Sequence, residues 1–120
     1  AVRSERPVQA YWFSHVSPNH PKPFLGATHG DELDLLFAAP VYPPGYALTR
    51  ADRVLSGNMM RAWHSFASGG QARLPDGEQP WPRYTVADRQ AHVWSEPPSP
   101  GTHRFDDPSR RCARWHRLLQ

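Results

Sequence analysis

Seven histidines are the side chains of this 120-residue sequence that are best suited to acid–base chemistry near neutral pH. Three of them, His15, His20 and His29, lie close enough together in sequence to suggest a metal site. Their spacing matches no zinc signature, and the one cysteine, Cys112, is far away along the chain. We therefore predict no metal site and interpret these histidines as surface or packing residues unless their local context indicates otherwise.

His29 has such a context. It follows a possible extended run at residues 24–28, and it precedes Gly30 and an acid-rich helix start. A junction between a strand and a helix can hold an imidazole at the carboxyl edge of a sheet, where active sites of α/β proteins gather. Gly30 would allow a tight turn, and nearby carboxylates favour a protonated imidazole. On spacing alone this signal is weak, because a loop histidine followed by glycine is usually only a loop.

A strand and a short helix would position this histidine. Residues 8–16 are rich in β-branched and aromatic side chains and predict a strand that is buried on both faces. Acidic residues occupy the first turn of a short helix after Gly30, where the helix dipole favours them. The predicted apolar stripe of this helix is Leu33, Leu36 and Phe37, and Pro40 ends it.

The clearest helix begins after Thr49, which is a good N-cap with Asp52 three residues on. Gly69 and Gly70 provide its end. Its predicted buried stripe consists of Ala51, Leu55, Met59, Ala62 and Phe66.

The rest of the chain predicts a strand at 90–94, a final helix at 109–119, and connections at 17–23, 70–82 and 96–102. These few strands form no plausible closed sheet, so partner strands should lie elsewhere. The 14 prolines, about twice the usual frequency, also suit a peripheral part of a larger fold. With 38% hydrophobic residues and five Trp, the chain is too apolar for a disordered tail.

Charge and hydropathy exclude other classes. The net charge is +3, and the basic residues near the end are interrupted by Asp106 and Asp107, with no nucleic-acid-binding module. We therefore predict no nucleic-acid partner, and interpret the basic run as a solvated or carboxylate-paired helix face. No apolar run approaches the 18 residues of a membrane span. The polar first residues show no signal peptide, which says nothing if the protein begins upstream.

Five runs, in order, resemble the type-B carboxylesterases, a family that includes cholinesterases, bile-salt-activated lipase and the liver carboxylesterases. The first is the run from His29 to Pro40, which is similar to that family's His-Gly-x-Glu segment around its catalytic histidine. The other four are similar to its Tyr-x-Phe strand, Trp-x-x-Phe-Ala helix end, Trp-Pro-x-Tyr element and terminal Cys-x-x-Trp: Tyr11 to His15, Met59 to Ala67, Trp81 to Tyr84, and Cys112 to Trp115.

The resemblance covers roughly residues 8–119 and implies the C-terminal part of an α/β-hydrolase, an α/β fold, with residues 1–120 as one segment of a single domain that is not self-sufficient. It implies that His29 is the general base and acid of a Ser-His-Glu/Asp triad in a serine esterase without metal or organic cofactor. Gly30 and Glu32 would be structural residues beside His29. Glu32 would not be the triad acid, since in the family that acid comes from an earlier loop.

No Gly-x-Ser-x-Gly elbow occurs in the chain, and Ser68-Gly69-Gly70 does not fit one. The resemblance therefore implies a partner, the N-terminal part that carries the serine and the triad acid, and we predict that this chain alone hydrolyses no ester. It also implies that Cys112 forms a disulfide with a cysteine outside the chain, which would place the protein in an extracellular, oxidising compartment. A free thiol is the alternative.

Departures from the family pattern bear on substrate and role. Pro21 and Asp31 stand near positions where cholinesterases carry aromatic residues, which argues against a choline ester as the substrate. Gln71 and Ala38 depart from the family's Gly-Asn-Pro-Asn turn and Phe-Gly-x-Pro ending. Two alternatives remain open: a cholinesterase-like binding or adhesion module that has lost catalysis, and an unrelated small domain that folds alone.

Overall fold

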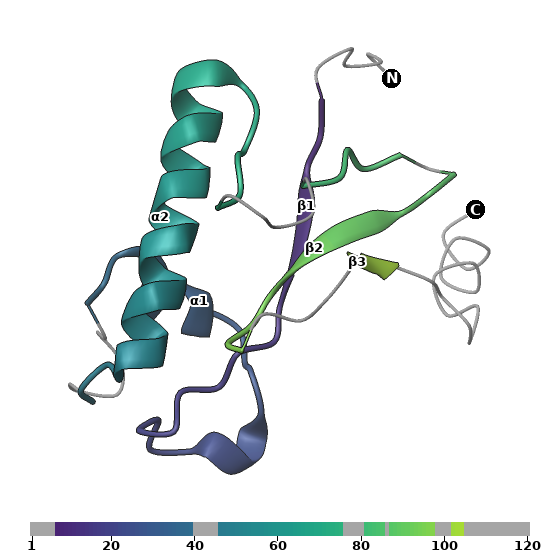
Figure 1. The fold of residues 1–120 in the computed structure, drawn as a ribbon. Coiled ribbons are helices and arrows are strands. Elements are labelled where there is room, and N and C mark those ends of the chain that lie inside the picture. The colour runs from purple at the N-terminus through teal and green to yellow at the C-terminus, as the bar shows by residue number, and fades with distance from the viewer. Residues whose placement is uncertain (1–6, 40–45, 76–80, 86, 98–101, 105–120) are drawn as a thin grey trace.

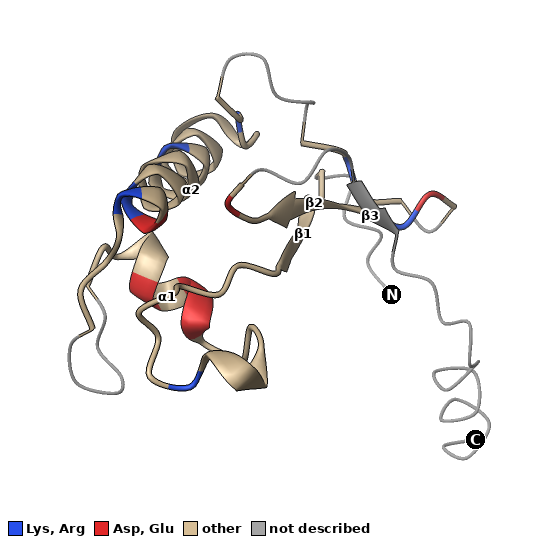
Figure 2. Ribbon diagram, turned by 60° about the horizontal axis from the view of Figure 1, so that its bottom comes forward, with Lys and Arg blue, Asp and Glu red and all other residues tan. Residues whose placement is uncertain are grey.

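The computed structural model describes residues 7–39, 46–75, 81–85, 87–97 and 102–104. The elements, in chain order, are β1 (Ala10–Phe13), a 3₁₀ turn η1 (Pro23–Leu25), α1 (Asp31–Leu36), α2 (Arg50–Gly69), β2 (Gln90–Trp94) and β3 (Thr102–Arg104). Both helices lie on one side of the sheet, as two views show (Figures 1 and 2). The predicted final helix at 109–119 and Cys112 lie outside the described residues.

The three strands form one sheet in the order β1-β2-β3. β1 and β2 are parallel, with Ala10 opposite Ala91 and Phe13 opposite Trp94, and α2 lies in the connection between them. Such a crossover is what parallel neighbours require. β3 is antiparallel to β2 and starts at Thr102, where only a connector was predicted. Three residues carry too little pattern to indicate a strand.

One face of the sheet packs against α2. Side chains that lie opposite each other in register share a face, so Tyr11 and Phe13 project with His92 and Trp94. Trp63 of α2 meets this face, with its ring centroid 5.1 Å from that of Tyr11 and 6.1 Å from that of Trp94. Around these rings lies the buried core, which consists of Leu35, Leu55, Met59, Ala62, Ala72, Trp81 and Trp94.

The opposite face of β1 is less covered, and the prediction of a strand buried on both faces is wrong for the described residues. Trp12 projects from that face and is 46% exposed. The reason is that α1 and α2 both lie on the other side of the sheet (Figure 1).

The start and end of α2 are confirmed. Thr49 and Asp52 form a reciprocal capping box, and Gly70 ends the helix with a φ of 71°. Leu55, Met59 and Ala62 of the predicted stripe are buried. The stripe is wrong at Phe66, which is 44% exposed, and at Ala51, which is only partly buried. Polar Asp52 and Ser56 are buried in the first turns instead, because they bind two other segments of the chain.

Two predictions near His29 are also wrong. The run at 24–28 is not extended, because Pro23 opens the 3₁₀ turn η1. In α1 the predicted stripe is wrong at Leu33 and Phe37, which are exposed, whereas Leu36 packs against the core and the unpredicted Leu35 joins it. A six-residue helix has fewer than two turns, so its sequence periodicity cannot fix which face is buried.

Candidate functional site

His29 lies on the surface immediately before α1. Gly30 is the N-cap of that helix and has a φ of 93°, a conformation that disfavours residues with a Cβ. The tight turn predicted at Gly30 is therefore confirmed. A Cβ at Gly30 would meet no atom within 4 Å, so the constraint is conformational and not steric.

An open hollow beside His29 is lined on its other sides by Lys22, Leu25, Thr28, Asp31 and Phe37, among others. No serine is among the described residues that line it. Thr28 does line it, but its hydroxyl donates to Asp31 at 3.0 Å. The hollow therefore presents an imidazole without a nucleophile from the described part of the chain.

Acidic residues, red on the ribbon of Figure 2, occupy the first turn of α1. Asp31 accepts hydrogen bonds from the backbone N–H of Thr28, at 2.7 Å, and from its hydroxyl. His20 Nε2 lies 4.0 Å from the same carboxylate, at Oδ1. Asp31 thus organises the loop that precedes His29, and its carboxylate is engaged with that loop.

The other two carboxylates of α1 face different neighbours. Asp34 is buried and hydrogen-bonded to Tyr46, and burial followed by the charge of Asp34 raises the pKa of the Tyr46 phenol. Glu32 is partly buried. Burial raises the pKa of Tyr11, and the negative charge of Glu32 raises it further, so Glu32 acts electrostatically on β1.

A second histidine, His15, has the strongest polar contacts of the described residues around α2. His15 Nε2 donates to Asp52 Oδ1 at 2.6 Å, and the Ser17 hydroxyl donates to Asp52 Oδ2 at 2.7 Å. All three side chains are buried. Burial disfavours the charged form of Asp52, but the hydrogen bonds from His15, Ser17 and Thr49 outweigh it and hold the pKa of Asp52 below its ordinary value.

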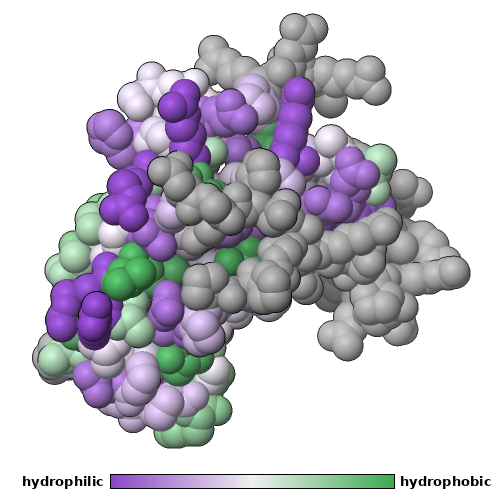
Figure 3. All heavy atoms as spheres, in the orientation of Figure 1, coloured by the Kyte–Doolittle hydropathy of each residue, from purple (hydrophilic) through white to green (hydrophobic). Residues whose placement is uncertain are grey.

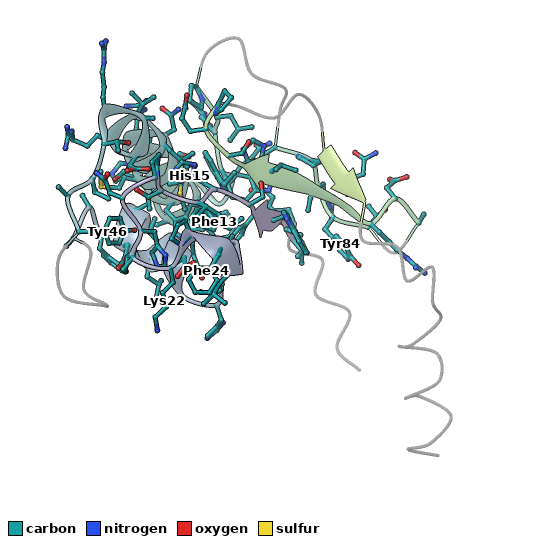
Figure 4. All side chains as sticks on the ribbon, turned by 90° about the horizontal axis from the view of Figure 1, so that it is seen from below. Phe13, His15, Lys22, Phe24, Tyr46 and Tyr84 are labelled. Carbon is teal, nitrogen blue, oxygen red and sulfur yellow. The ribbon has the colours of Figure 1, made fainter. Side chains whose placement is uncertain are left out.

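The sequence analysis missed this buried cluster. It interpreted His15 as a surface or packing residue and Asp52 only as part of a helix cap. No sequence signal pairs the two, because 37 positions separate them. Figure 4 shows His15 close to α2, whereas Lys22 and Phe24 project outward from the same end of the molecule.

His92 is a third distinct histidine. Its ring is buried against Trp94, with the two centroids 4.4 Å apart, and burial lowers its pKa to about 4. Within the described part of the chain, neither His92 Nε2 nor Trp94 Nε1 has a hydrogen-bond partner. A neutral His92 therefore packs as part of the aromatic core.

The described ranges contain neither a candidate metal site nor a candidate membrane-spanning helix. They contain no group of three or more His, Cys, Asp or Glu side chains placed to hold a metal ion. Likewise, none of their helices combines the length and the apolar character that a bilayer crossing needs.

Comparisons with known proteins match the chain to one family. The model of the carboxylesterase family matches residues 1–115. Acetylcholinesterase from Gallus gallus is 36% identical over 114 residues, which are 93% of this chain and 14% of that protein. Bile salt-activated lipase from Homo sapiens is 38% identical over 82 residues, 64% of this chain and 10% of that protein. Carboxylesterase 4A from Bos taurus is 38% identical over 81 residues, 65% of this chain and 14% of that protein. The chain thus spans less than a fifth of the length of these relatives.

Proposed function

Because this chain belongs to the carboxylesterase family, we propose that it forms the C-terminal segment of an α/β-hydrolase domain that hydrolyses carboxylic esters, with His29 as the triad histidine. The observation that carries this proposal is the placement of His29. It stands directly before the N-cap of α1, at the end of the loop from β1 that also holds His15 and His20; its ring is exposed beside a hollow, and no described residue hydrogen-bonds to it.

In the proposed reaction the imidazole of His29 takes the proton of a serine hydroxyl as that oxygen attacks the ester carbonyl. It then gives the proton to the leaving alkoxide, and the serine carries the acyl group. His29 next deprotonates a water that attacks the acyl-serine, and the serine recovers its proton as the acid leaves. The serine, the triad acid and the oxyanion hole come from the N-terminal part of the hydrolase, outside this chain.

Gly30 and Glu32 assist in this proposal without contacting substrate. Gly30 supplies the left-handed turn that lets the chain reverse into α1 directly after the histidine. Glu32, in the first turn of α1, is partly buried, and its negative charge acts on Tyr11 of β1. We propose that both hold the backbone of the histidine turn against the sheet.

The exposed apolar surface supports the proposal that residues 1–120 are part of a larger domain. Leu25 and Phe37, which line the His29 hollow, are 55% and 69% exposed, and Phe24, next to Leu25, is 81% exposed. Apolar side chains reach the surface at this end of the molecule (Figure 3). In addition, β1 pairs with β2 alone among the described strands, which leaves one edge for another strand. A covering N-terminal part would bury both features.

Cys112 extends the proposal to the compartment. We propose that it forms a disulfide with a cysteine of the N-terminal part and that the protein is extracellular. Three of the five resemblance runs lie fully in the described residues, but the run with Cys112 does not. The proposed disulfide therefore has to be tested by a chemical measurement on the protein.

A fluorophosphonate probe, which labels activated serines, tests the proposed function. The complete protein that contains this chain should take up the label on its N-terminal part and hydrolyse p-nitrophenyl esters, while the isolated chain should do neither. Intact-mass analysis with and without reduction reports on Cys112. A complete protein that takes up no label and hydrolyses no ester would contradict the esterase proposal and favour the non-catalytic binding module.

A further inference from the structure

The segment that carries His29, residues 18–30, is attached at both ends to the same two turns of α2. We propose that Asp52 and Ser56 are positioning residues that hold His29 in place for catalysis, an inference that rests on the proposed function. The two residues are four positions apart on one helix, so their side chains lie one above the other on one face.

The first attachment lies immediately before the segment. Asp52 accepts hydrogen bonds from His15 at 2.6 Å and from Ser17 at 2.7 Å, and none of the carboxylate is exposed. Both donors follow directly on β1, so the carboxylate fixes the point at which the chain leaves the sheet. Hydrogen bonds to a charged acceptor in a buried setting are strong and directional, which makes this end rigid.

The second attachment lies just after the segment. The Ser56 hydroxyl donates to the carbonyl oxygen of Leu35 at 2.5 Å, and Ser56 is 1% exposed. Leu35 itself is in the core. Because α1 has only six residues and starts at Asp31, fixing Leu35 fixes the helix whose N-cap follows His29.

Contacts within the segment transmit this attachment to the histidine. Asn19 Nδ2 donates to the carbonyl oxygen of Ala47 at 2.7 Å, just before α2. Thr28, the residue before His29, is held to Asp31 through its backbone and its hydroxyl. Between these contacts the chain runs through exposed Pro21 to Leu25. His20 adds a contact inside the segment, because its ring centroid lies 5.5 Å from that of Tyr46 and its Nε2 lies 4.0 Å from Asp31. The position of His29 therefore depends on the two ends and on this contact.

Capping alone does not account for Asp52. The capping box uses Oδ2, which accepts from the Thr49 N–H at 2.7 Å. Oδ1 accepts a hydrogen bond from His15, and Oδ2 also accepts one from Ser17. Both donors belong to the chain that leaves β1 and not to the helix. The capping-box carboxylate of a free helix end would be solvated, whereas the carboxylate of Asp52 is enclosed.

The test compares two variants with matched controls in the complete protein. Asp52→Asn keeps the shape of the side chain but removes the charged acceptor, and Ser56→Ala removes one hydroxyl. Asp88→Asn is the control for the first, because Asp88 forms a similar three-residue-spaced pair with Thr85 at an exposed turn. Ser68→Ala is the control for the second, since Ser68 bonds to its own helix near the exposed end.

Turnover is measured per active site, titrated with the fluorophosphonate, so that loss of folded protein does not count as loss of rate. We expect kcat to fall about tenfold in Asp52→Asn and about threefold in Ser56→Ala, with KM within about twofold, because small misplacements of a catalytic group reduce rate more than binding. Both controls should match the parent protein. Hydrogen exchange of residues 18–30 should rise in the two test variants only.

The outcomes separate this inference from the proposed function. Unchanged kcat per site and unchanged exchange in both test variants would overturn the inference, even if their melting temperatures fell. If Asp52→Asn does not fold, Ser56→Ala and the milder Ser17→Ala decide in the same way. If the parent protein itself takes no label, the proposed function fails, and exchange of residues 18–30 still tests whether the attachment exists.

Discussion

The surroundings of His15 and His29 are opposite in character, although only 13 intervening positions separate these histidines. His15 is 6% exposed and donates to a buried carboxylate, in a cluster whose hydrogen bonds come from within the chain. His29 is exposed, lies in a hollow, and has no hydrogen bond to a described residue.

This difference shows that a histidine–carboxylate pair is not by itself a mark of catalysis. The His15 cluster satisfies its own polar atoms, as buried groups must, and it has no access for a substrate. The His29 ring is left exposed, and in the proposed function a carboxylate and a serine from the N-terminal part complete the site. In the proposed account, the region of His15 fixes the structure and thereby holds the region of His29.

Removing the Asp52 carboxylate should have the largest effect on stability. Asp52→Ala leaves His15 and Ser17 buried without their acceptor, and we expect the free energy of unfolding to fall by about 3 kcal/mol. His29→Ala should change it by less than about 0.5 kcal/mol, because the ring is exposed. Urea denaturation of both variants measures this contrast. Equal losses would remove the distinction between the two regions.

Protonation of the core histidine, His92, should lower the stability at acidic pH, with a smaller effect than loss of the Asp52 carboxylate. The pKa of His92 falls from 6.5 to about 4 in the folded chain, so between these values the unfolded chain binds a proton that the folded chain does not. The stability that comes from neutral His92 is complete above pH 6.5 and is lost as the pH falls toward 4.

His92→Phe should therefore flatten the melting temperature between pH 7 and pH 5. The Asp52 pKa is also lowered, so its stabilisation is present above the pKa of the unfolded carboxyl and is lost only at more acidic pH, as the folded carboxyl titrates. Matching pH profiles in the parent protein and in His92→Phe would show that His92 is not the group that titrates.

Gly30→Ala should have a small effect on stability, well below that of Asp52→Ala, and still reduce activity. A Cβ at a φ of 93° costs about 1 kcal/mol, although no neighbouring atom would clash with it. We expect slower fluorophosphonate labelling, because relaxing the turn moves His29. Gly69→Ala, in the last turn of α2, is the control, and a labelling rate as low as that of Gly30→Ala would contradict this account.

Local signals in the sequence predicted the helices and strands that have clear capping residues or a typical composition. Thr49 with Asp52 and the Gly69-Gly70 pair set the bounds of α2, and the strands around Tyr11 and His92 follow from their composition. The family follows from runs of residues such as His29 to Pro40, and the comparisons confirm it. These features depend on residues close together in the chain.

What the sequence analysis missed depends on contacts between distant segments. Burial of Asp52 and Ser56 requires His15, Ser17 and Leu35 to reach the first turns of α2. Exposure of Leu33 and Phe37 depends on which side of the short α1 meets the core. The catalytic role proposed for His29 rests on resemblance and placement, since its proposed partners are not in this chain.

The rate of fluorophosphonate labelling in the complete protein tests the central claim most directly, with His29→Gln compared with the parent and with His64→Gln. His64 is an exposed histidine on α2, away from the hollow of His29, and so provides a matched control. The account predicts that His29→Gln slows labelling by about a thousandfold or more while His64→Gln labels like the parent. Labelling of His29→Gln at the parental rate would contradict it.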